Sequence, residues 1–110
     1  MARAAAIGVE IVVPHVADAE VLSGLRGLFL SRQIDHEDFT DAAEVLATMP
    51  MPRFPMRGLH QRVVQLRDNL TTYDATYVAL AEALDLKLVT FDRGIARAPG
   101  ITCDVMLLEA

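Results

Sequence analysis

Residues 66–97 read LRDNLTTYDATYVALAEALDLKLVTFDRGIAR, and this stretch decides the fold class. Thr71 is a favourable N-cap residue, and the apolar run after it predicts a helix to about Leu84. The segment Lys87–Phe91 predicts a short strand, Asp92 the start of a helical turn, and Ile101–Leu108 a final strand. Helices that alternate with strands in this way are typical of an α/β domain.

The chain before residue 66 continues the same alternation. Val9–Val13 predicts a strand that ends at Pro14. We expect Asp18 to cap one helix and Asp35 to open a second, each with an apolar face toward the core. The expected core-facing residues are Val21, Leu22, Leu25, Leu28, Phe29 and Leu30 in the first helix, and Phe39, Ala42, Ala43, Val45, Leu46 and Met49 in the second.

A proline-rich segment separates these helices from the rest of the chain. Pro50, Pro52 and Pro55 allow only an extended or edge segment there. A third helix is expected over Met56–Asp68. The sequence therefore predicts a parallel sheet flanked by helices, in a single domain that spans residues 1–110.

Composition narrows the function classes. Of the 110 residues, 53% are hydrophobic, and the net charge of −5 argues against a protein that grips nucleic acid by raw electrostatics. The longest apolar stretch, near residues 4–13, contains Glu10 and is too short to span a membrane. The single Cys103 cannot form an internal disulfide, so we expect a protein of the reducing cytosol.

Three acidic residues fall near the expected carboxyl ends of the strands, where function collects in parallel sheets. Glu20 is expected in the first turn of the helix after the first strand, and Asp74 in the first turn of the helix after Thr71. Asp92 directly follows a strand, with Thr90 two residues earlier. Carboxylates gathered at one edge need hard cations between them, and Mg²⁺ or Mn²⁺ would support attack of water on a phosphodiester.

Each of these acids also has a structural interpretation. Thr71 and Asp74 match a capping box, Glu20 can complement the helix dipole, and Asp92 can be an ordinary N-cap. Spacing alone leaves both interpretations open. Three further charged residues, Arg57, Arg62 and Arg67, recur at five-residue spacing, which indicates a solvated face rather than one stripe.

Residues 66–97 resemble the C-terminal half of PIN-domain ribonuclease toxins of the VapC type. The similar parts are YDATYVALAEAL (73–84), LVTFD (88–92) and IAR (95–97), while VPHVADAEVLSGLRGL (13–28) is similar to that family's second strand and the helix with its second acid. The resemblance implies a flavodoxin-like three-layer sheet and a divalent-metal endoribonuclease inhibited by a small cognate antitoxin. It also implies metal-site roles for Glu20, Asp74 and Asp92, with Thr90 as a positioning group behind them.

The sequence departs from this family at its start. The family begins with its central strand, which ends in the first catalytic Asp, and nothing similar precedes Val9. Residues 1–8, MARAAAIG, look like the tail of the helix that follows that strand. Glu10 begins its own strand and so lies at the wrong end to replace the acid. We therefore expect an N-terminally shortened PIN-like domain of uncertain activity, whose open sheet edges favour a homodimer.

Two functions compete on these grounds. The leading hypothesis is a cytoplasmic, metal-dependent endoribonuclease toxin of a type II toxin–antitoxin system, with RNA as substrate, an antitoxin as partner and no membrane association. The alternative is a non-catalytic binding module whose first two helices dock an antitoxin or another protein. A phospho-acceptor receiver domain fits less well, because its late Lys is matched only by Lys87 at the start of a strand.

Overall fold

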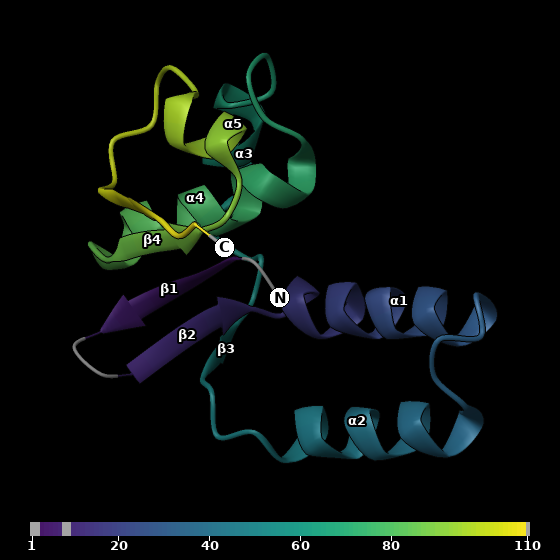
Figure 1. Cartoon of the computed structure of the whole chain (residues 1–110). Helices are drawn as coiled ribbons and strands as arrows, with labels where there is room; N and C mark the ends of the chain where they lie inside the picture. The colour runs from purple at the N-terminus through teal and green to yellow at the C-terminus, as the bar shows by residue number, and fades with distance from the viewer. Residues whose placement is uncertain (1–2, 8–9, 110) are drawn as a thin grey trace. The chain divides into compact units, whose positions relative to one another are not determined.

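The computed structural model describes residues 3–7 and 10–109, with side chains from residue 11 onward. The chain divides into two compact units: unit 1 comprises Met1–His15 and Met51–Ala110, and unit 2 comprises Val16–Pro50. The elements of unit 1 are β1 (Arg3–Ile7), β2 (Glu10–Pro14), β3 (Arg53–Phe54), α3 (His60–Gln65), α4 (Thr72–Leu84), β4 (Lys87–Thr90), α5 (Arg93–Arg97) and β5 (Val105–Leu107), and those of unit 2 are α1 (Val16–Leu30) and α2 (His36–Thr48) (Figure 1).

Unit 1 is built on a five-stranded sheet in the order β3-β2-β1-β4-β5. Strand β2 is parallel to β3, and β4 is parallel to β5. The central strand β1 is antiparallel to both neighbours, with Ala5 opposite Val12 of β2 and Leu88 of β4. Four strands therefore point in one direction and their carboxyl ends share one edge, as the sequence predicts for an α/β fold.

Strand β1 corrects the expectation for the N-terminal residues. The segment Arg3–Ile7 is a strand rather than the tail of a helix; residues 1, 2, 8 and 9 lie outside the described part of the chain. Alanine favours helices in isolation, but a segment between β2 and β4 can pair with two rows of backbone N–H and C=O groups. Backbone pairing with both neighbours outweighs the helical preference of the alanines, so Arg3–Ile7 occupies the central position between β2 and β4.

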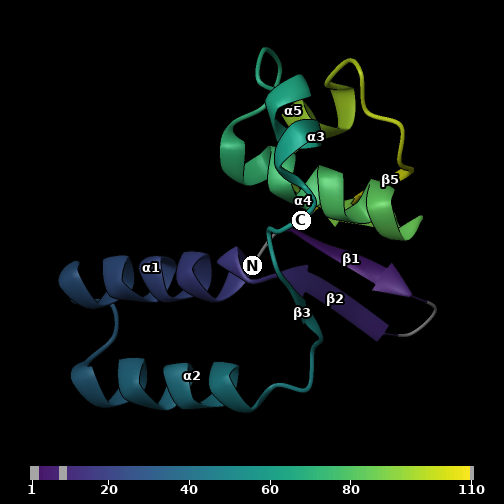
Figure 2. The same ribbon diagram turned by 180° about the vertical axis from the view of Figure 1, so that it is seen from behind.

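Helix α4 forms the centre of the core of unit 1. It contacts β1, β2 and β4 on the sheet, α3 packs against it, and α5 contacts β4 and β5 (Figures 1 and 2). All side chains from Ala75 to Ala81 are buried, so this helix is covered nearly all round. Further buried apolar side chains of unit 1 lie on β2, on β4, in α3 and the turns around it, and in α5. They include Val12, Val13, Leu59, Val63, Leu66, Leu70, Leu88 and Ile95.

Several element boundaries are tighter than predicted. Helix α3 covers only His60–Gln65 of the expected Met56–Asp68, and β5 covers only Val105–Leu107 of the expected final strand. The proline-flanked strand β3 is confirmed as a short edge strand beside β2. Its position follows from the prolines, because a residue without an N–H group weakens a central ladder.

Unit 2 consists of two helices that pack against each other. Asp35 caps α2 as predicted, in a capping box in which its Oδ1 accepts from Asp38 N (2.8 Å) and Asp38 Oδ2 accepts from Asp35 N (3.1 Å). Asp18 lies in the first turn of α1 instead of capping it.

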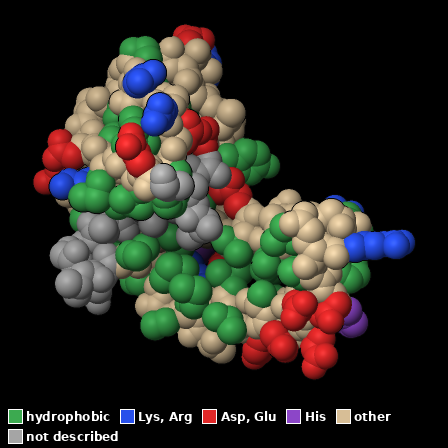
Figure 3. All heavy atoms as spheres, viewed as in Figure 1, with side chains coloured by type: hydrophobic (Ala, Val, Ile, Leu, Met, Phe, Trp, Pro, Cys, Tyr) green, Lys and Arg blue, Asp and Glu red, His purple; other side chains and the backbone are tan. Residues whose placement is uncertain are grey.

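The expected burial of both apolar faces of unit 2 is wrong for most of their residues. Among the described residues of this unit only Ala17 and Leu46 are buried, whereas Val45 is 61% exposed. Figure 3 shows hydrophobic side chains over α1 and α2 and acidic ones over the start of α2. Two helices can bury only the seam between them, so the amphipathic pattern does not guarantee a covered face.

Candidate active site

Asp74 lies in the first turn of α4, where the backbone is fixed by a side-chain cap. Thr71 is the N-cap residue, and its Oγ1 accepts a hydrogen bond from Asp74 N (3.1 Å). The predicted cap is thus confirmed for the hydroxyl and backbone half of the capping box. The Asp74 side chain is half-buried at the start of a helix whose next seven residues are fully buried. Its position is therefore rigidly coupled to the core.

Asp92 follows β4 directly and caps α5. Its Oδ1 accepts hydrogen bonds from Gly94 N (2.7 Å) and Ile95 N (3.3 Å), which confirms the N-cap interpretation. Among the described residues nothing donates to its second oxygen, Oδ2, and the side chain is exposed. Capping and ligand binding are compatible here, because the two functions can use different oxygens of one carboxylate.

Thr90 positions Asp92 through the backbone. Its side chain is completely buried, and its Oγ1 accepts a hydrogen bond from Asp92 N (3.0 Å). Its carbonyl oxygen accepts from Leu108 N (2.7 Å), which ties the end of β4 to the segment after β5. A buried hydroxyl with one partner in reach holds the turn after β4 in one conformation. The geometry fits a positioning role for Thr90.

The topology of unit 1 places Asp74 and Asp92 at the same end. Only Asp85 and Leu86 connect α4 to β4, so the chain reverses direction there. The helix extends about 15 Å from Leu84 back to Asp74 at 1.5 Å per residue. Strand β4 extends about 10 Å from Lys87 forward to Thr90 at 3.3 Å per residue, and Asp92 follows two residues later. Because α4 packs against β4, both acids reach the same level of the unit, at the carboxyl edge of the sheet.

Glu20 is not part of this pair. It lies in unit 2, half-buried in α1, beyond the first turn that the sequence predicts for it because the helix begins at Val16. Within the described part of the chain, no three His, Cys, Asp or Glu side chains are grouped to hold a metal ion. Asp74 and Asp92 supply oxygen donors of the kind that Mg²⁺ and Mn²⁺ prefer. Their donor chemistry fits such an ion, with two protein ligands from this unit.

An ion pair near the C-terminal end of α4, away from the candidate site, has no counterpart in the sequence predictions. Arg62 of α3 donates from Nε to Glu82 Oε1 (2.6 Å) and from Nη2 to Glu82 Oε2 (3.1 Å) and to Gly100 O (2.6 Å). The backbone N–H of Thr102 donates to Glu82 Oε2 (2.8 Å). The interpretation of Arg62 as part of a solvated face is therefore wrong. Only its 20-residue separation from Glu82 in sequence hides the pair, because spacing rules cover neighbours on one helix.

Comparisons with known proteins identify the family of the chain. The sequence profile of the PIN domain matches residues 1–101. The chain belongs to the PIN-domain family. Its PIN domain is 44% identical over 97 residues to "Ribonuclease VapC1" of Mycobacterium tuberculosis, covering 87% of this chain and 73% of that protein. It is also 38% identical over 96 residues to "VapC ribonuclease Mb0985" of Mycobacterium bovis, covering 87% of this chain and 76% of that protein. The resemblance to VapC-type proteins is thus confirmed.

No solved structure matches the chain of this PIN domain at a significant level. None of the described helices combines the length and the hydrophobicity that a membrane-spanning helix requires. The fold class predicted from sequence, an α/β PIN-like domain, is confirmed by the family match and by the mixed sheet with its flanking helices.

Proposed function

We propose that this PIN-domain protein is the endoribonuclease toxin of a type II toxin–antitoxin system and acts in the cytoplasm. One observation carries the proposal: a chain whose relatives are named VapC ribonucleases brings Asp74 and Asp92 to the same end of unit 1. The alternative, a binding module without catalysis, is not favoured, because it gives no reason for two acids at that edge. Single-stranded RNA is the proposed substrate.

A divalent cation, Mg²⁺ or Mn²⁺, is the proposed cofactor. Asp74 and Asp92 would hold it, and the metal-site role of Glu20 stays a prediction from the sequence. When bound, such an ion activates water and neutralises charge on a phosphodiester. The residues of the chain do the rest: Thr90 fixes the backbone of Asp92, and the cap of α5 occupies Oδ1 so that Oδ2 is the oxygen that faces a ligand.

The proposed protein partner is a cognate antitoxin, with unit 2 as its docking site. Leu22, Phe29, Phe39 and Ala43 line an apolar groove of about 710 Å³ along α1 and α2. An amphipathic helix is the partner that such a groove accepts. Titration calorimetry with the product of the neighbouring gene should detect binding that Phe39→Asp weakens. Homodimerisation is proposed as well, and sedimentation equilibrium measures it directly.

A cleavage assay on total RNA tests the catalytic proposal. The full chain should cleave RNA when Mg²⁺ or Mn²⁺ is added and stop when EDTA removes the ion. Asp74→Asn and Asp92→Asn should abolish cleavage while circular dichroism stays unchanged, since Asn can still cap α5 at position 92 and Thr71 still caps α4. Asp68→Asn, an exposed acid in the turn after α3, is the matched control and should cleave normally. Equal cleavage by all three variants would refute the assigned roles.

A further inference from the structure

Two aromatic side chains next to the candidate acids are exposed. Tyr73 directly precedes Asp74 and is 57% exposed, and Phe91 directly precedes Asp92 and is 48% exposed. The remaining aromatic residues of unit 1 behave differently, because Tyr77 is buried and Phe54 is half-buried. In this unit, therefore, the aromatic rings that face solvent are those beside the two acids.

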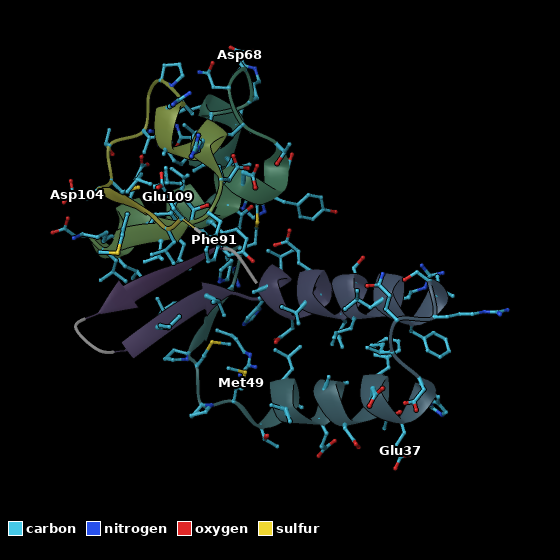
Figure 4. All side chains as sticks on the ribbon, viewed as in Figure 1. Glu37, Met49, Asp68, Phe91, Asp104 and Glu109 are labelled. Atoms are coloured by element: carbon cyan, nitrogen blue, oxygen red, sulfur yellow. The ribbon has the colours of Figure 1, made fainter. Side chains whose placement is uncertain are left out.

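The backbone at both rings is held in place. Tyr73 lies in the first turn of α4, between the Thr71 cap and the buried part of the helix. Phe91, labelled in Figure 4, lies between Thr90 and Asp92. These two neighbours are joined by the hydrogen bond from Asp92 N to Thr90 Oγ1. Tyr73 and Phe91 are the chain neighbours of Asp74 and Asp92 and so lie at the same end of the unit. Both rings therefore present an apolar face to solvent at the carboxyl edge of the sheet.

The charge of the chain limits the kinds of contact by which this edge could hold RNA. At −5 the protein has little long-range attraction for a polyanion, so RNA must be held by other contacts. Single-stranded RNA offers unstacked bases, which bind exposed aromatic side chains face to face. A protein surface would gain from the same apolar area, but it gains nothing from having acids beside each ring.

We propose that Tyr73 and Phe91 are base-stacking residues that bind the nucleotides on either side of the phosphate to be cleaved. This inference rests on the proposed function, since it takes RNA as the ligand of this edge. Stacking tolerates any base because every base has a π face. The platform formed by Tyr73 and Phe91 would therefore add affinity for RNA and fix the register of the RNA strand relative to Asp74 and Asp92, without selecting a base sequence.

The test uses the full chain and a short single-stranded RNA that carries 2-aminopurine, whose fluorescence falls when it stacks. Titration is performed in EDTA, so that neither cleavage nor metal binding contributes. Tyr73→Leu and Phe91→Leu keep an apolar side chain but remove the ring, and each should raise the Kd at least about 5-fold and abolish the quenching. Tyr73→Phe and Phe91→Tyr keep the ring and should behave as the original chain does.

Two controls separate stacking from other causes. Val64→Ala removes an exposed apolar side chain of α3, 58% exposed, and should leave the Kd unchanged. An RNA with abasic nucleotides at the bound positions should bind all variants equally. If the Leu variants quench and bind like the original chain, or change only the sedimentation of the protein, the rings contact no base and the proposal fails.

The cleavage assay keeps this inference distinct from the proposed function. Stacking in EDTA without any metal-dependent cleavage would refute the endoribonuclease proposal and leave the platform in place. Metal-dependent cleavage with the same KM in the Leu variants and the original chain would refute the platform and leave the endoribonuclease in place.

Discussion

The ion pair between Arg62 and Glu82 should contribute a large share of the stability of unit 1. It joins α3 to α4, and through Gly100 O and Thr102 N it also holds the segment that leads into β5. The side chain of Glu82 is only 11% exposed and that of Arg62 is 30% exposed. Burial alone raises the pKa of Glu82, but the hydrogen bonds from Arg62 and Thr102 outweigh it, so the pKa lies below its ordinary value.

The magnitude follows from what each truncation leaves behind. Exposed ion pairs contribute about 0–1 kcal/mol, whereas removing one partner of a fully buried pair costs about 3–5 kcal/mol. The Arg62–Glu82 pair lies between these limits, because water reaches the guanidinium but hardly the carboxylate. Glu82→Ala should therefore lower the free energy of unfolding by about 2–3 kcal/mol. For a domain of this size that is a fall in Tm of roughly 10–20 °C.

Urea unfolding of Arg62→Ala, Glu82→Ala and the double variant measures the coupling directly. We expect a coupling free energy of about 1–2 kcal/mol, since both residues belong to one hydrogen-bond network. Arg93 and Glu109 are the matched control: their 3.5 Å pair is 65% and 69% exposed, and the same cycle should give less than about 0.5 kcal/mol. Equal coupling in the two pairs would refute the argument from burial.

Three further effects are expected on stability. Because folding lowers the pKa of Glu82, its ionised carboxylate stabilises the fold above pH ~4.5, and this stabilisation is lost as the pH falls through the lowered pKa. Glu82→Gln should therefore flatten the dependence of Tm on pH between about 5 and 3, as measured by differential scanning fluorimetry. Thr71→Ala removes the cap of α4 and should cost about 1 kcal/mol in urea unfolding, whereas Thr72→Ala, with no cap to lose, should be near neutral. Asp85 ends α4 at φ 54°, so Asp85→Gly should stabilise by up to about 1 kcal/mol, while Ala83→Gly inside the helix should destabilise by a similar amount; a fall in stability for Asp85→Gly would contradict the strain argument.

The sequence predicts the elements that have strong local signals. Thr71, Asp35 and Asp92 all cap helices where the pattern places them, because a capping side chain and its helix are a few residues apart. Strand β1 does not follow from its own sequence, because its stability comes from pairing with β2 and with β4; Ala5, for example, lies opposite Val12 and opposite the distant Leu88. The exposed faces of α1 and α2 were missed because periodicity shows which face is apolar but not whether anything covers it.

In and around the candidate site, some residues have local sequence signals and others become identifiable only from the packing. The positions of Asp74, Thr90 and Asp92 on their elements follow from caps and strand ends, and the structure adds that the short α4–β4 connection brings them to one end. Tyr73 and Phe91 could not be selected from sequence, because residue type alone does not show whether an aromatic side chain is buried, as Tyr77 is, or exposed. Arg62 and Glu82 needed the packing of α3 on α4 to become neighbours.

The direction of β1 decides what the central strand can contribute to the candidate site. A central strand parallel to β4 would end at the edge where Asp92 lies and could place an acid there. Strand β1 is antiparallel, so Ile7 lies at the far end beside Glu10, and Arg3 is the residue opposite Thr90. Strand β1, whose described sequence is RAAAI, therefore supplies no carboxylate to that edge. For this reason we expect metal binding in unit 1 to depend on Asp74 at the start of α4 and Asp92 after β4, and not on the central strand.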